Sequence, residues 1–125
     1  MLIGYTSGIF DLFHQGHINY LTECKKYCDF LFVGVDSDQR TALSKGVGRP
    51  IENINSRLKK VSEFCDISFE KKESSWVYIE KIRPKILFRS AQNPIIDQKE
   101  NVKIIYIPYT LDISTTILIS KLNVN

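Results

Sequence analysis

The chain has 125 residues, of which 43% are hydrophobic and 25% are charged, as expected for one soluble globular domain spanning residues 1–125. The net charge is only +3 and the cations are scattered, which argues against a nucleic-acid partner and favours a small anionic substrate. No secretory signal opens the chain, and no apolar run reaches the roughly 18 residues that span a bilayer, so we expect a cytoplasmic protein without membrane insertion.

Short apolar runs alternate with helical patterns along the chain. The predicted strands are Leu2–Tyr5, Phe30–Val35, Ile67–Phe69, Ile86–Phe88 and Val102–Ile107. The predicted helices are Ile18–Lys25, Ser56–Phe64, Ser75–Ile82 and Ser114–Leu122, and the Gly- and Pro-containing segment Leu43–Pro50 is predicted to be a loop. Strand–helix alternation with continuous apolar strands predicts an α/β fold, a single doubly wound, Rossmann-like domain with a mainly parallel five-stranded sheet.

The segment Gly8–His17, between the first predicted strand and the first helix, carries the strongest sign of chemistry. Ligands of open parallel sheets bind beyond the carboxyl ends of the strands, which is where this segment lies. His14 and His17 are the two histidines of the chain, and three-residue spacing at a helix start lets both rings face one group. Gly16 lets a phosphate approach the helix N-terminus, so the segment predicts phosphate binding. Zinc would need a further ligand, and no metal held by protein residues is expected.

Hydroxyl side chains open the last predicted helix at Ser114, Thr115 and Thr116. Such residues cap free N–H groups or bind an anion, and a plain cap would explain them by itself. Together with the histidine segment, they favour binding of the β- and γ-phosphates of a nucleotide.

Two motifs at opposite ends of the chain support a family resemblance. Gly8–His17 resembles the G-x-F-D-x-x-H-x-G-H signature of the cytidylyltransferase-like nucleotidyltransferases, and Tyr109–Thr116 resembles their R-T-x-x-I-S-T-T element. The overall pattern is most similar to that of the glycerol-3-phosphate cytidylyltransferases. The resemblance implies CMP transfer from CTP to a phosphorylated small alcohol or polyol with release of pyrophosphate. It also implies Mg²⁺ accompanying the NTP, and a homodimer.

The resemblance assigns roles residue by residue. It implies catalytic roles for His14, His17 and Lys45, with Arg57 and Arg89 as additional phosphate contacts. The implied nucleotide-binding residues are Gly8, Ile9, Phe10, Asp11, Gly16, Arg49, Tyr109, Thr110, Ile113, Ser114, Thr115 and Thr116. An alternative interpretation is that Lys45 and Arg49 are solvent-exposed loop charges without a role in binding. For Arg57, the alternatives to a phosphate contact are a structural role and a surface position. The region Ser75–Tyr78 is expected to contribute to the acceptor pocket, with Trp76 alternatively a core residue.

The sequence departs from the family pattern in three places. Glu63 replaces an arginine of an R-Y-V-D element, Arg89–Gln92 replaces a G-D-D-W-like turn, and Tyr109 replaces the arginine that opens the second motif. The loop Lys45–Pro50 also resembles that of adenylyltransferases that activate heptose phosphates with ATP. Three hypotheses therefore stand: CMP transfer, ATP-dependent adenylyl transfer to a sugar phosphate or cofactor precursor, and nucleotide binding with little turnover.

Overall fold

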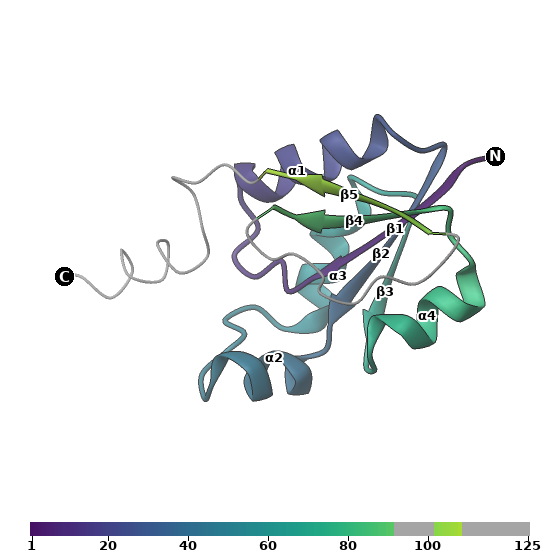
Figure 1. Ribbon diagram of the computed structural model, residues 1–125. Coiled ribbons are helices and arrows are strands. Elements are labelled where there is room, and N and C mark those ends of the chain that lie inside the picture. Colours follow the sequence, from purple (N-terminus) through teal and green to yellow (C-terminus); the bar gives the residue numbers. More distant parts are fainter. Residues whose placement is uncertain (92–101, 109–125) are drawn as a thin grey trace.

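The computed structural model describes residues 1–91 and 102–108 (Figure 1). The predicted helix Ser114–Leu122 and the motif Tyr109–Thr116 lie outside the described residues. Among the helices of the described ranges, none combines the length and apolarity needed to cross a membrane.

The described residues form a parallel sheet with the strand order β3-β2-β1-β4-β5. The strands are β1 (Ile3–Gly8), β2 (Phe30–Asp36), β3 (Ile67–Lys71), β4 (Ile86–Ser90) and β5 (Lys103–Ile107). The helices are α1 (Gln15–Lys25), α2 (Asp38–Lys45), α3 (Ile54–Ser62) and α4 (Ser75–Ile82). The predicted α/β fold with a five-stranded parallel sheet is thus confirmed.

Each face of the sheet has its own apolar cluster, because side chains of a strand alternate between faces. The cluster on one face includes Leu21 of α1 and Val61 of α3, and we call this side the α1 face. The cluster on the other face includes Tyr5 of β1 and Ile79 of α4, and we call it the α4 face. Trp76 packs at the edge of that second cluster, as its core interpretation expected.

Four of the five strands, β1 to β4, extend further toward their carboxyl ends than their apolar runs predicted, whereas β5 ends at Ile107 as predicted. The clearest case is β1, which ends at Gly8 and not at Tyr5. Thr6 remains in the buried strand because its hydroxyl donates to the carbonyl of Phe88 at 3.0 Å and lies 2.8 Å from the hydroxyl of Tyr20. A satisfied hydroxyl costs little to bury, so strands continue through polar residues that the apolar criterion excludes.

Three helices depart from the prediction: α1 begins at Gln15 and not at Ile18, α2 was not predicted as a helix, and α3 is shifted. The first three residues of the predicted loop Leu43–Pro50 belong to α2, which begins after Ser37, a cap whose hydroxyl accepts from the N–H of Arg40 at 3.1 Å. Helix α3 begins and ends two residues earlier than predicted, because Asn53 caps it by accepting from the N–H of Ser56 at 2.9 Å. Helix α4 has the predicted bounds.

Candidate active site

His14 and His17 begin helix α1 as a reciprocal cap. Nδ1 of His14 accepts from the N–H of Gly16 at 3.0 Å, and the N–H of His14 donates to Nδ1 of His17 at 3.2 Å. Histidine thus takes the places that Ser or Thr and Glu occupy in the usual capping box. The main chain thereby fixes the position of both rings at the N-terminus of α1.

These bonds also determine where each ring carries its proton. A nitrogen that accepts a hydrogen bond is unprotonated, so each neutral imidazole carries its hydrogen on Nε2. Burial lowers the pKa of His14, and burial together with the neighbouring His14 lowers the pKa of His17 to about 3. Near neutral pH both rings are therefore uncharged and carry an Nε2–H group.

Aromatic packing holds the ring of His17 in place. Its centroid lies 3.9 Å from that of His14 and 5.3 Å from that of Phe13, in stacked arrangements on both rings. Phe10 contacts it edge-on at 5.4 Å. His17 is only 6% exposed, whereas His14 is half-buried, so His14 offers the more accessible surface of the pair.

Asp11 ties the histidine loop to the segment that precedes α3. Its buried carboxylate accepts from the N–H groups of Ile51 at 2.7 Å and Glu52 at 2.9 Å, and Arg49 Nε lies 3.4 Å from it. The flanking residues Phe10 and Leu12 have φ values of 55° and 48°, a conformation that costs about 1–3 kcal/mol per residue. The bonds to Asp11 offset this strain and make its carboxylate a loop anchor.

The side chain of Arg57 hydrogen-bonds to the same loops from within the protein interior. Its fully buried guanidinium donates through Nη1 to the carbonyls of Ile9 at 2.8 Å and Asp36 at 2.7 Å. Nε donates to the carbonyl of Glu52 at 2.9 Å, and Nη2 pairs with Asp38 at 2.6 Å. Of the roles considered for Arg57, this geometry favours the structural one, and it leaves no part of the side chain on the surface.

The cytidylyltransferase-like family model matches residues 5–121. The chain belongs to the cytidylyltransferase-like family. This membership confirms the family resemblance that the two motifs predicted.

Relatives and a solved structure support this membership. The chain is 34% identical over 128 residues to the bifunctional protein HldE of Desulfatibacillum aliphaticivorans, and 37% identical over 91 residues to that of Nitrobacter hamburgensis. The alignments cover 94% and 70% of this chain but only 26% and 18% of those relatives. The crystal structure of a lipopolysaccharide core biosynthesis protein from Thermoplasma volcanium is 30% identical, with a TM-score of 0.76, over 87% of this chain and 98% of that one.

The structure brings some of the expected family residues together and places others apart. Gly16 and Phe10 lie beside the histidine pair, and Gly8 ends β1 with no room for a Cβ, which would fall 2.9 Å from the Phe10 ring. Lys45 is exposed at the last residue of α2, and Arg89 lies on β4. The expected nucleotide contacts Tyr109, Thr110, Ile113, Ser114, Thr115 and Thr116 lie outside the described residues.

Glu63, one of the departures from the family pattern, is an exposed residue at the C-terminal end of α3. The next residue, Phe64, packs against Phe13 of the histidine loop, with ring centroids 5.6 Å apart. Glu63 therefore directly precedes a residue that contacts the loop of the two histidines.

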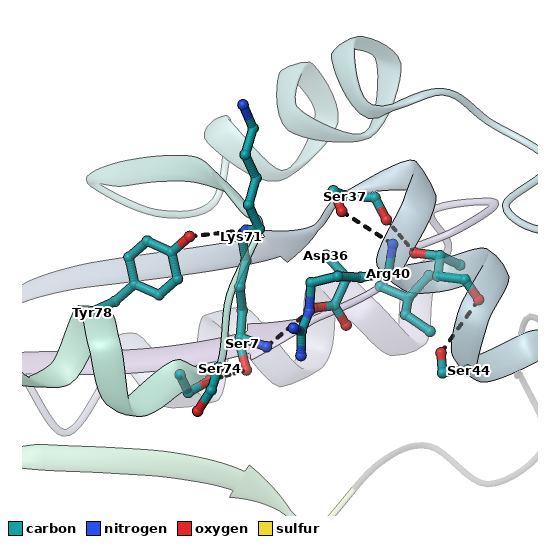
Figure 2. A network of polar contacts seen from close by, with 12 residues as sticks. Ser7, Asp36, Ser37, Arg40, Ser44, Lys71, Ser74 and Tyr78 are labelled. Carbon is teal, nitrogen blue, oxygen red and sulfur yellow. Dashed lines mark hydrogen bonds and ion pairs between the residues drawn. The ribbon is translucent and has the colours of Figure 1, made fainter.

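A second polar group at the carboxyl edge of the sheet was not among the sequence predictions. Figure 2 shows Lys71 of β3 and Arg40 of α2 meeting at Asp36 of β2. Asp36 and Lys71 are register partners in the sheet but are 35 positions apart in sequence. The only signal in the sequence was that each directly follows a predicted strand or lies close to its end.

Proposed function

We propose that this chain transfers a nucleoside monophosphate from an NTP to the phosphate of a phosphorylated sugar or polyol. The observation that carries the proposal is the pair of Nε2–H donors at the N-terminus of α1, fixed there by main-chain bonds. A helix N-terminus with two adjacent neutral donors favours the binding of a phosphate group. Family membership supports the same reaction class.

The reaction joins two phosphates and releases a third group. An oxygen of the acceptor phosphate attacks the α-phosphorus of the NTP, the new P–O bond forms, and the bond to the β-phosphate breaks to release pyrophosphate. Charge shifts onto the oxygens of the transferring group, where His14 and His17 would donate their Nε2–H groups. Positioning and charge stabilisation suffice, so no covalent intermediate with the protein is proposed.

Mg²⁺ is proposed to enter with the NTP. Near the histidine pair, the carboxylate of Asp11 is already occupied by three main-chain N–H groups and by Arg49. Phosphate oxygens of the NTP would thus hold the cation, as is usual for Mg²⁺, and it would neutralise part of their charge. Lys45 and Arg49, at the two ends of the glycine-containing segment after α2, are proposed to add positive charge around the phosphates.

For the nucleotide and acceptor, ATP and a sugar phosphate are favoured by two observations. The loop Lys45–Pro50 resembles that of adenylyltransferases acting on heptose phosphates, and the similar Thermoplasma volcanium protein is described as acting in lipopolysaccharide core biosynthesis. The second candidate is CMP transfer from CTP to glycerol 3-phosphate, favoured by the overall motif pattern. A cytoplasmic homodimer remains our expectation in both cases.

Pyrophosphate release tests the proposal directly. The purified chain is incubated with Mg²⁺ and either ATP or CTP, together with glycerol 3-phosphate or a heptose 1-phosphate. Release that requires both an NTP and an acceptor supports transfer and identifies the base. NTP binding without release under all conditions would instead support a nucleotide-binding module, and absence of NTP binding would exclude both.

Variants of His14 separate catalysis from helix capping. His14→Asn keeps a side-chain acceptor for the N–H of Gly16 but removes the Nε2–H, whereas His14→Ala removes both. Loss of one donor to the transferring phosphate lowers kcat by about 10²–10³-fold, so we expect this loss in both variants. Only His14→Ala should also lose about 1 kcal/mol of stability. Full activity in His14→Asn would contradict the proposed role.

A further inference from the structure

The carboxyl ends of four strands place a row of polar side chains on the α4 face. Residues two positions apart in a strand lie on the same face of the sheet. On the α4 face, Tyr5 is therefore followed by Ser7, and Leu87 is followed by Arg89. On β2 and β3 the corresponding residues are Asp36 and Lys71. We use the name carboxyl-edge cluster for these four strand residues together with two neighbouring helix residues. Its members are Ser7, Asp36, Lys71, Arg89, Arg40 and Ser75.

One carboxylate faces more than one cation in this cluster. Lys71 Nζ lies 3.1 Å from Oδ1 of Asp36, and Arg40 Nε lies 3.4 Å from the same oxygen (Figure 2). Burial lowers the pKa of the Lys71 amine, Asp36 opposes this shift, and the neighbouring positive charges of Arg40 and Arg89 add to it. Two cations, Lys71 and Arg40, thus face the single carboxylate of Asp36, and this positive excess favours a bound anionic group.

Lys71 occupies a position with little freedom. It is 6% exposed, and its chain passes over Gly34, where an added Cβ would fall 3.3 Å from Lys71 Cδ and 3.1 Å from the Tyr5 hydroxyl oxygen. That hydroxyl donates to Ser75 Oγ at 3.1 Å, and Ser7 Oγ lies 3.2 Å from the same atom. Three hydroxyls thus adjoin the ion pair, which gives the cluster both donors and acceptors.

Resting on the proposed transfer, we propose that the carboxyl-edge cluster binds the acceptor, and that Lys71 and Asp36 determine its specificity for a polyhydroxylated phosphate ester. Both the cluster and the histidine loop adjoin the end of β1, one through Ser7 and the other through Gly8 and Ile9. The cluster lies on the opposite face of the sheet from α1, so it does not compete with a nucleotide held at the histidine pair. The carboxylate can accept hydrogen bonds from vicinal hydroxyl groups of the acceptor, and the amine and the hydroxyls can donate to them. The positive excess of the cluster attracts the phosphate of the acceptor.

The neighbouring lysine provides a matched control for the test. Lys71→Met removes the buried amine, whereas Lys72→Met makes the same change on a side chain that is 72% exposed. Binding of ATP, CTP, glycerol 3-phosphate and mannose 1-phosphate is measured by calorimetry on the full chain, and KM for the acceptor is measured wherever turnover is seen. We expect Lys71→Met to weaken the binding of phosphate esters by about 10-fold or more while the NTP Kd stays within about two-fold. Lys72→Met should match the wild type.

Two further variants keep the proposal testable if Lys71→Met folds poorly. Lys71→Arg keeps the charge and should retain most acceptor affinity. The double variant Lys71→Met/Asp36→Asn removes both charges of the buried pair and leaves only Arg40, whose side chain is 37% exposed, without this carboxylate. The double variant should bind mannose 1-phosphate more weakly relative to glycerol 3-phosphate. Equal affinity of wild type and Lys71→Met for the esters, equal weakening of NTP binding, or no binding of either ester by the wild type would overturn the inference. Failure of the proposed transfer itself is seen separately, as absence of NTP binding or of pyrophosphate release.

Discussion

The histidine loop and the carboxyl-edge cluster meet at the end of β1 but are held together by different forces. Main-chain hydrogen bonds and stacked rings fix His14 and His17, and both rings are neutral. Side-chain charges hold Asp36, Lys71 and Arg40. A neutral, main-chain-held group keeps its geometry as the salt concentration varies, whereas a group of charges responds to the charge of whatever binds. One edge of a sheet can therefore combine hydrogen-bond donors in fixed positions with a group of charges that selects what binds.

The largest effect is expected where one residue supports both regions. Arg57→Met removes the donor shared by the carbonyls of Ile9 and Asp36 and leaves several buried carbonyls without it. We expect a loss of about 3 kcal/mol or more in the free energy of unfolding, measured with urea. Lys59→Met, an exposed change on the same helix, should stay within about 0.5 kcal/mol of the wild type. A loss below about 1 kcal/mol for Arg57→Met would show that the two regions do not depend on this residue.

A pH titration of stability isolates the histidine loop. His17 is neutral in the folded protein because its pKa is lowered to about 3, while the unfolded chain takes up a proton near the ordinary value of 6.5. This contribution to stability is therefore complete above the unfolded pKa and is lost as the pH falls toward the folded pKa. From about pH 7.5 to about pH 5, His17 should make the wild type lose about 2 kcal/mol more than His17→Asn does. Parallel pH profiles of the two proteins would contradict a buried neutral His17.

The smallest expected effect isolates the carboxyl-edge cluster. Gly34→Ala places a Cβ 3.1 Å from the Tyr5 hydroxyl oxygen, 3.2 Å from Phe69 Cζ and 3.3 Å from Lys71 Cδ. These side chains must move by a few tenths of an ångström, at a cost of about 1 kcal/mol. We expect acceptor KM to rise by about two- to five-fold while NTP affinity is unchanged, as read by steady-state kinetics and calorimetry. An NTP affinity that falls as much as acceptor affinity would show that the two regions are not separate.

The histidine loop could be predicted from the sequence because its parts are local. His14, Gly16 and His17 lie within one helical turn, and the strand before them marks the carboxyl edge of the sheet. What the sequence did not show was that Asp11 and Arg57 serve the loops through buried bonds, because their partners lie 40 and 48 positions away. Spacing along the chain carries no information on such contacts.

The charged centre of the carboxyl-edge cluster, Asp36 with Lys71 and Arg40, was missed for a related reason, although Arg89 and Ser75 were among the predicted phosphate and acceptor residues. Its members come from separate strands and helices, and the apolar criterion ended β2 and β3 just before Asp36 and Lys71. Helix α2 was not predicted because its residues show no apolar periodicity, so Leu43–Lys45 was assigned to a loop. Ser37, which caps this helix, was the signal that could have indicated it. The sequence predicted that the sheet is parallel. The register that pairs Asp36 with Lys71 depends on packing across the whole sheet, so it could not be predicted.

The shared bond at Arg57 also bears on motion. Because one nitrogen donates to both Ile9 and Asp36, the ends of β1 and β2 cannot part without breaking a buried hydrogen bond. The histidine loop and the carboxyl-edge cluster, the proposed nucleotide and acceptor sides, are thus tied to each other through this guanidinium. Adaptation to substrates then falls to segments that this guanidinium does not contact, such as the exposed turn 46–48 with its two left-handed glycines.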